Sequence, residues 1–225
     1  MPGGIIVIIV LGVALVATIA VLGYLREKKR REAFQALAAR MGLRFSPDRD
    51  HQLPRHFRFL DKLRQGSNRY AFNVLDGDYE GHYVQAFDFH YETHSTNSKG
   101  HRQTHHHHFS FFILELPRRF PELRIYPEGL LSKFGQMVGF DDIDFESVAF
   151  SRAFCVRSTD KKFAYDICHA RMMEYLLGDP KLSLEIEDAY LALSFDRRLD
   201  VQEVPGRLRQ LVEIRNLFPD YLLRG

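Results

Sequence analysis

The sequence predicts an α+β protein, in which an N-terminal transmembrane helix is followed by a mainly antiparallel sheet with packed helices. Three observations predict this class. They are a long uncharged apolar segment at the N-terminus, runs of alternating apolar and polar residues that follow one another, and segments of helical spacing between or after these runs. Strands gathered in runs, with helices between the runs, favour α+β over a parallel α/β sheet.

The apolar segment covers residues 5–25, which are twenty-one consecutive residues without a charge. At a rise of 1.5 Å per residue, a helix of this length covers roughly 30 Å, the thickness of the hydrocarbon core of a bilayer. A cleavable signal peptide is the alternative interpretation, but its basic residues precede its apolar core. Here the basic residues follow the apolar segment, so the sequence predicts an uncleaved single-pass anchor.

A basic collar follows the anchor directly. Its members are Arg26, Lys28, Lys29, Arg30 and Arg31. Because basic residues stay on the cytoplasmic side of a membrane, the collar predicts an N-terminus outside and a C-terminal domain in the cytoplasm, at the inner membrane. Each cation near the surface can also attract anionic lipid by about 1 kcal/mol. The lipid bilayer is therefore the first expected partner.

The residues after the anchor keep a helical rhythm. Apolar side chains at i, i+1, i+4, i+5 and i+8 share one stripe of a helix, and here they are Ala33, Phe34, Leu37, Ala38 and Met41. Gly42 is typical of a residue that ends a helix. We expect a transmembrane anchor (1–25), a juxtamembrane basic amphipathic helix (26–42) and a cytoplasmic α+β domain (43–225).

The next part of the chain predicts the sheet. A short strand is expected over 43–45 and a short helix over 56–63. Alternation then predicts strands over 70–75, 82–93 and 103–116, which form an antiparallel meander. We expect a turn at Asp76 and Gly77, and an exposed polar loop between Glu92 and Arg102.

The C-terminal part predicts further helices and strands. In order, they are a helix over 130–137, strands over 140–147 and 150–158, a helix over 161–177, a hairpin over 182–195 that turns near Glu187 and Asp188, and a helix over 204–217. Residues 154–160 (FCVRSTD), the helix after them and the segment EIEDAYLALSF together resemble a group of uncharacterised bacterial membrane-anchored proteins. The resemblance implies an N-terminal anchor and a cytoplasmic α+β domain. The role of that group is unassigned, so no functional residue is carried over.

Composition excludes some classes of function. The formal net charge is only +2, and five cations lie beside the membrane, so the folded part lacks the basic balance of a nucleic-acid-binding protein. Two cysteines, Cys155 and Cys168, fit a reducing cytoplasm and match no zinc-binding spacing. Cys155 and His169 could form a thiol and imidazole pair, although buried structural cysteines are the more common case.

Histidines are concentrated around the second and third expected strands. Seven of the eleven lie within nineteen residues, and these are His90, His94, His101 and the run His105, His106, His107 and His108. Imidazole is the commonest side-chain ligand for zinc, copper and nickel. Alternation along a strand directs His105 and His107 to the same face. The predicted metal site is therefore His90, His105, His107 and Asp88, with zinc as the cofactor. The alternative is a polar strand end with unligated histidines.

A second cluster is acidic and consists of Asp141, Asp142, Asp144 and Glu146. Along an extended strand the last three share one face at intervals of about 7 Å, which could hold a hard cation. Calcium-binding loops need a turn with a supporting glycine, however, and none stands at the required offset. A solvated strand face is the favoured interpretation.

The sequence contains no phosphate-binding Walker loop, no GxGxxG motif and no GxSxG motif. No catalytic residue is predicted, and an enzyme is not favoured. The preferred function is a membrane-anchored cytoplasmic domain that binds a partner protein or lipid. The alternative is a membrane-tethered metal-binding or metal-dependent hydrolytic protein that uses the histidine-rich strands.

Overall fold

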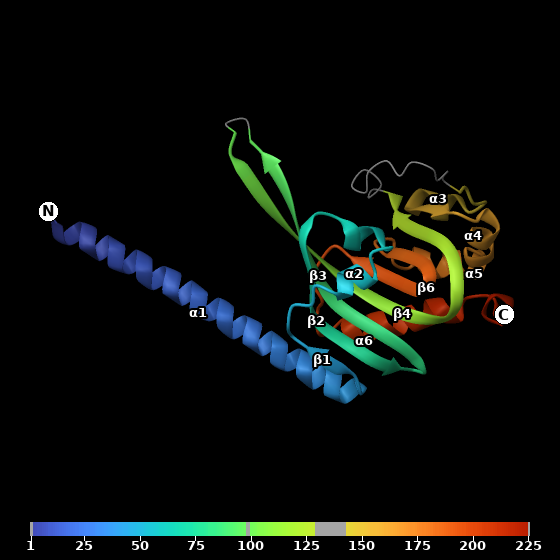
Figure 1. Cartoon of the computed structure of the whole chain (residues 1–225), viewed down its shortest axis with the longest axis horizontal. Coiled ribbons are helices and arrows are strands. Elements are labelled where there is room, and N and C mark those ends of the chain that lie inside the picture. The colour runs from blue at the N-terminus through green and yellow to red at the C-terminus, as the bar shows by residue number, and fades with distance from the viewer. Residues whose placement is uncertain (1, 98–99, 129–142, 225) are drawn as a thin grey trace.

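One long helix and one antiparallel sheet form most of this protein (Figure 1). The computed structural model describes residues 2–97, 100–128 and 143–224. Helix α1 (Pro2–Met41) extends away from the body of the protein, which contains the sheet and the other helices. The α+β class predicted from the sequence is confirmed.

Helix α1 continues without interruption from the apolar segment through the basic collar. It has 40 residues and ends before Gly42, whose φ of +71° is a left-handed conformation that glycine adopts without strain. Its C-terminal part packs in the core through Phe34, Leu37 and Ala38, which are all at most 2% exposed. Within Val10–Met41, the part of this helix whose side chains are described, the most apolar window of 18 residues has a mean hydropathy of 1.7 and is not buried in the protein. The apolar part is therefore a candidate membrane span.

The sheet has six antiparallel strands. They are β1 (Arg44–Ser46), β2 (Ser67–Tyr79), β3 (His82–Thr96), β4 (Arg102–Pro127), β5 (Phe154–Ser158) and β6 (Ser183–Phe195). The first four strands pair in sequence order, as the predicted meander requires. Strand β4 is long enough to pair with β3 along its first half and with β5 near its end, while β6 pairs with its middle and last parts.

Helices and helical turns cover both faces of the sheet. They are α2 (Leu53–His56), the 3-10 turn η1 (Asp61–Arg64), α3 (Val148–Ala153), α4 (Lys161–Ile167), α5 (Ala170–Leu177), α6 (Val204–Asn216) and α7 (Asp220–Leu223). The C-terminal part of α1 and helices α3 to α6 contribute to one apolar core, which includes the even-numbered residues Val84, Ala86 and Phe112. Side chains next to α2 and η1 form the second core, which includes the odd-numbered Phe87 and Phe111.

Two predicted turns are wrong because the strands continue through them. Strand β2 runs past Asp76 and Gly77 to Tyr79, and the chain reverses at Glu80 and Gly81, which both have positive φ. Residues 183–195 of the predicted hairpin form the single strand β6. The long strand β4 pairs with β6 along most of its length. The pairing register shifts on both sides of the pair Asp188 and Phe120, but β6 continues through this point.

The predicted helix over 161–177 is two helices, α4 and α5. His169 lies between them and its Nδ1 accepts a hydrogen bond from the backbone N–H of Met172, so it caps the second helix. The predicted strand over 150–158 starts only at Phe154, because Ser147 caps helix α3. The predicted helix over 130–137 lies outside the described residues.

Candidate functional site

The junction between α1 and the sheet contains a buried ion pair. Arg30 Nη2 lies 2.8 Å from Asp88 Oδ2, and Asp88 is fully buried. Arg30 also donates to the carbonyl oxygen of Leu199 at 2.7 Å. Asp88 accepts further hydrogen bonds from the backbone N–H of Leu199 at 2.6 Å and from Asn73 Nδ2 at 2.8 Å. A buried carboxylate needs this number of partners to offset its lost hydration.

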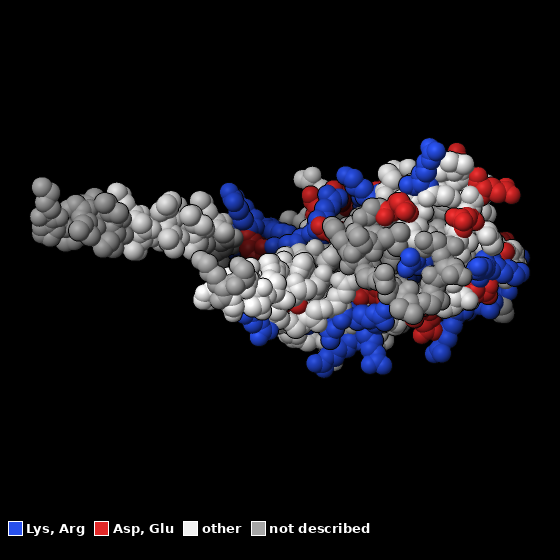
Figure 2. Space-filling model, turned by 90° about the horizontal axis from the view of Figure 1, so that it is seen from above, with Lys and Arg blue, Asp and Glu red and all other residues white. Residues whose placement is uncertain are grey.

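The other members of the basic collar have a different environment. Arg26, Lys28, Lys29 and Arg31 are exposed, while Arg30 is only partly exposed. Lys and Arg side chains gather where α1 meets the body, and the described apolar part of the helix carries none (Figure 2). Arg30 therefore has a structural role in the fold. The four exposed members of the collar are the ones available to lipid headgroups.

The predicted metal ligands lie on the two long strands β3 and β4. Their hairpin leaves the body on the side from which α1 extends (Figure 1). The register pairs His90 with His108, Tyr91 with His107 and Thr93 with His105. Because paired residues share a face and neighbours alternate, His90 faces the α1 side, whereas His105 and His107 face the opposite side.

The predicted ligands therefore do not come together. His107 Nε2 lies 2.8 Å from Thr93 Oγ1, and His105 Nε2 lies 2.8 Å from Ser95 Oγ. Asp88 lies on the same face as His90, as expected, but its carboxylate is held by Arg30 and the other donors of the junction.

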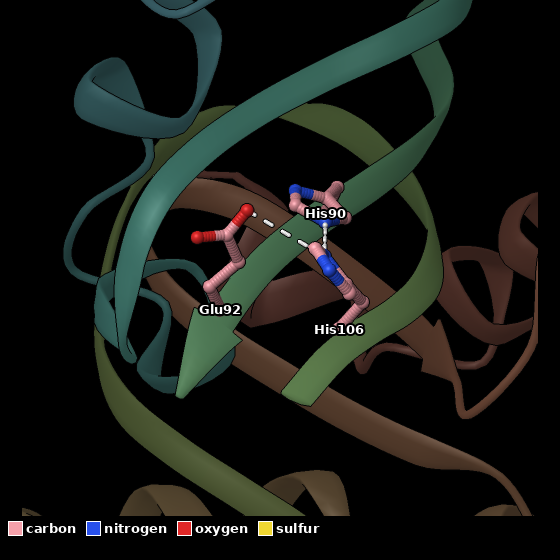
Figure 3. Close-up of side chains that lie close together, drawn as sticks. All are labelled: His90, Glu92 and His106. Carbon is pink, nitrogen blue, oxygen red and sulfur yellow. Dashed lines mark hydrogen bonds and ion pairs between the residues drawn. The ribbon is translucent and has the colours of Figure 1, made fainter. Parts of the chain in front are cut away.

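A different set of three side chains does converge. His90 and Glu92 on β3 and His106 on β4 point toward one another (Figure 3). His90 Nε2 lies 3.1 Å from His106 Nδ1, which lies 3.5 Å from Glu92 Oε1. One ligand atom from each residue lies within 4.8 Å of the other two, so the group could hold a metal ion. The sequence does not show the register between β3 and β4, and this register brings the three side chains together.

Asn68 of β2 orients two of these three residues. It has a φ of +48° at a register shift between β2 and β3. Its carbonyl oxygen lies 3.2 Å from His90 Nδ1, and its Nδ2 donates to Glu92 Oε1 at 2.7 Å. Burial lowers the pKa of His90, and the hydrogen bond from Asn68 lowers the pKa of Glu92. Both shifts favour the metal-binding forms, a neutral imidazole and a carboxylate.

A second polar cluster is buried between η1 and the sheet. Arg124 Nη1 lies 2.5 Å from Asp61 Oδ2, and the backbone N–H of Asp61 donates to Glu185 Oε2 at 3.1 Å. All three residues are at most 5% exposed. Burial raises the pKa of Glu185, and burial together with Glu122 raises the pKa of Glu187 to about 7. This cluster was not predictable from the sequence, because Glu185 alternates with Leu184 and Ile186 as in a strand with one solvent face.

The remaining candidates serve the fold. Cys155 and Cys168 are buried, and burial raises the pKa of the Cys168 thiol to about 12. His169 Nε2 bonds the carbonyl oxygen of Leu217 at 2.8 Å, and its Nδ1 caps α5, so neither nitrogen is free to activate a thiol. Asp144 and Glu146 lie in irregular chain before α3, and Asp141 and Asp142 lie outside the described residues.

These features define a class of protein: an α+β domain that is joined without a linker to the one candidate membrane helix found among the described residues. No family model matches the chain, and no curated protein matches it. Among solved structures, it is similar to the crystal structure of the mycobacterial trehalose monomycolate transport factor A, TtfA. The TM-score is 0.59 at 15% identity, and the match covers 85% of this chain and 95% of that chain. At this identity the likeness concerns the fold.

Proposed function

We propose that this protein is a single-pass accessory protein of the inner membrane, whose cytoplasmic α+β domain binds an integral membrane protein beside it. The observation that carries the proposal is the rigid connection between the anchor and the sheet. Helix α1 is continuous, and Arg30 and Asp88 join it to β3. Arg30 lies only five positions, about 7.5 Å of helix, beyond Leu25 at the end of the apolar segment. The body is therefore held against the membrane surface.

The proposed orientation of the protein in the membrane rests on charge. Four exposed members of the basic collar, Arg26, Lys28, Lys29 and Arg31, follow the apolar part of α1. They are suited to the anionic headgroups of the cytoplasmic leaflet, which is the side that basic flanks select. The domain after them is then cytoplasmic, with the N-terminus outside.

The β3–β4 hairpin is the surface that we propose contacts the partner. It projects from the body on the side from which α1 leaves, so it lies near the membrane when α1 spans it (Figures 1 and 2). Residues 93–96 on β3 and 102–106 on β4 are exposed. TtfA, a structural neighbour, is named a trehalose monomycolate transport factor. That name supports an integral membrane transporter as the class of partner.

Site-specific photo-cross-linking in living cells tests this function. A photoreactive residue at Thr93, on the exposed hairpin, should form a product with one integral membrane protein. The same residue at Lys162, whose side chain is 83% exposed on α4, is the matched control and should not form that product. Equal products from both positions would contradict a hairpin contact.

A second variant tests the rigid connection itself. A short flexible insertion after Leu25 leaves the anchor and the body intact but uncouples their positions. We expect this variant to remain in the membrane fraction and to lose the Thr93 product. If the product persisted at the same yield, the fixed position of the body would not matter, and the proposal would need another basis.

A further inference from the structure

We infer that His90, Glu92 and His106 form a binding site for one divalent transition-metal ion, which joins β3 to β4 at the base of the hairpin. Zinc is the ion that these ligands suit best. Two imidazoles and one carboxylate are a ligand set that zinc accepts in proteins, with a fourth position open to water. Hard cations such as calcium prefer a set made of oxygen atoms.

The spacing of the ligand atoms fits this ion. Zinc bonds imidazole nitrogen at about 2.0–2.1 Å and carboxylate oxygen at similar lengths, so two ligands of a tetrahedral site lie roughly 3.3 Å apart. His90 Nε2 and His106 Nδ1 are 3.1 Å apart, and His106 Nδ1 and Glu92 Oε1 are 3.5 Å apart. The side chains need little movement to coordinate an ion.

The surroundings hold the ligands in binding orientations. The Nδ1–H of His90 donates to the carbonyl oxygen of Asn68, which leaves the lone pair of Nε2 directed at His106. The amide of Asn68 holds Glu92. A carbonyl that accepts from the histidine and a donor that holds the carboxylate are characteristic of protein metal sites. The ring of His90 also stacks on Tyr70, with centroids 4.6 Å apart.

Access and burial also suit a bound ion. His90 is 4% exposed, whereas the side chain of His106 is 58% exposed. The site is therefore anchored by a fixed ligand on one side and open to solvent on the other, which gives an ion a way in.

Consecutive histidines also bind metals incidentally, and the fold supplies a control for that case. His105 is next to His106 and also exposed, but it faces the other side of the hairpin, where it bonds Ser95. The substitutions H105A and H106A remove the same side chain from neighbouring positions of the run. Only H106A removes a ligand of the inferred site.

The experiment uses the full chain in detergent micelles, purified without a metal column and stripped with a chelator. Zinc is titrated by calorimetry, and cobalt(II) is followed by its visible absorption. We expect one equivalent of each metal and a cobalt spectrum typical of four-coordinate geometry. H106A and E92Q should each weaken zinc binding at least tenfold, and H105A should change it less than twofold. Circular dichroism of the metal-free variants shows whether each one is folded.

Two results would overturn the inference. One is a wild-type protein that takes up no zinc at concentrations up to 0.1 mM. The other is an equal loss of affinity in H105A and H106A together with no effect of E92Q, which would assign the binding to the histidine run itself.

Discussion

Arg30 of α1 and Asp88 of β3 meet across the junction between helix and sheet, with 2.8 Å between guanidinium and carboxylate. Asp88 is fully buried and is two residues from His90 on the same face of β3. This face of the sheet therefore holds α1 and also carries the inferred metal ligands. The position of the hairpin relative to the anchor depends on a contact between residues 58 positions apart in the chain.

The ion pair gives a first prediction. Arg30→Ala leaves the buried carboxylate of Asp88 with fewer partners, and breaking a buried pair from one side costs about 3 kcal/mol. We expect the free energy of unfolding to fall by about that amount, measured by urea denaturation with far-ultraviolet circular dichroism. Arg31→Ala is the control, because the side chain of Arg31 is 52% exposed, and it should change stability by less than about 0.5 kcal/mol. Equal losses of unfolding free energy in the two variants would show that Arg30 stabilises the fold no more than the exposed Arg31 does.

The orientation of the anchor gives a second prediction. A reporter enzyme that is active only outside the cytoplasm, fused after Gly225, should be inactive in the wild-type fusion. Replacement of Arg26, Lys28, Lys29 and Arg31 with Glu removes the cationic flank while keeping Arg30, and should raise reporter activity. Equal expression of the two fusions is verified by immunoblot. A reporter that is active in the wild-type fusion would reverse the proposed topology.

Glu187, a partly buried carboxylate beside Arg124, gives a third prediction. Burial raises the pKa of Glu187 to about 7, whereas the ordinary value is 4.5. The folded state therefore binds more protons than the unfolded state between these values. The contribution of Glu187 to stability is fully present below pH 4.5 and is lost as pH rises toward 7. Glu187→Gln, which stays neutral, should be more stable than the wild type at pH 8 by on the order of 1 kcal/mol after allowance for solvent screening.

The measurement for Glu187 is the urea midpoint at pH 5 and at pH 8. The difference between the two midpoints should be smaller in Glu187→Gln than in the wild type. Glu115→Gln is the control because Glu115 is an exposed carboxylate on β4. If both variants kept the full pH dependence, the titration would belong to other groups.

The residue behind the metal ligands gives a fourth prediction. Asn68→Gly keeps the carbonyl that accepts from His90, and glycine suits the φ of +48°, so the backbone should stay folded. The variant loses the side-chain amide that holds Glu92. We expect zinc affinity to fall about tenfold, which is typical of the loss of a side chain that hydrogen-bonds a metal ligand. Calorimetric titration measures it, and unchanged affinity would remove Asn68 from the site.

Local patterns in the sequence were enough for the general architecture. The uncharged length of residues 5–25, the helical stripe that contains Phe34 and Leu37, and the stop at Gly42 depend on residues close together in the chain. The meander was also predictable, because alternation in β2, β3 and β4 is a property of each strand alone. The helical spacing over 161–177 did not predict the break at His169, which separates α4 from α5.

The sequence by itself thus determined the candidate membrane span, the α+β class and the concentration of histidines on two neighbouring strands. Only the tertiary structure decided which histidines meet. The register that pairs His90 with His108 directs His106 toward Glu92 and directs His105 and His107 away, because side chains alternate with a period of two. It also decided that Glu185 is covered by η1 rather than solvated. Both outcomes depend on contacts between distant segments, which one-dimensional spacing does not contain.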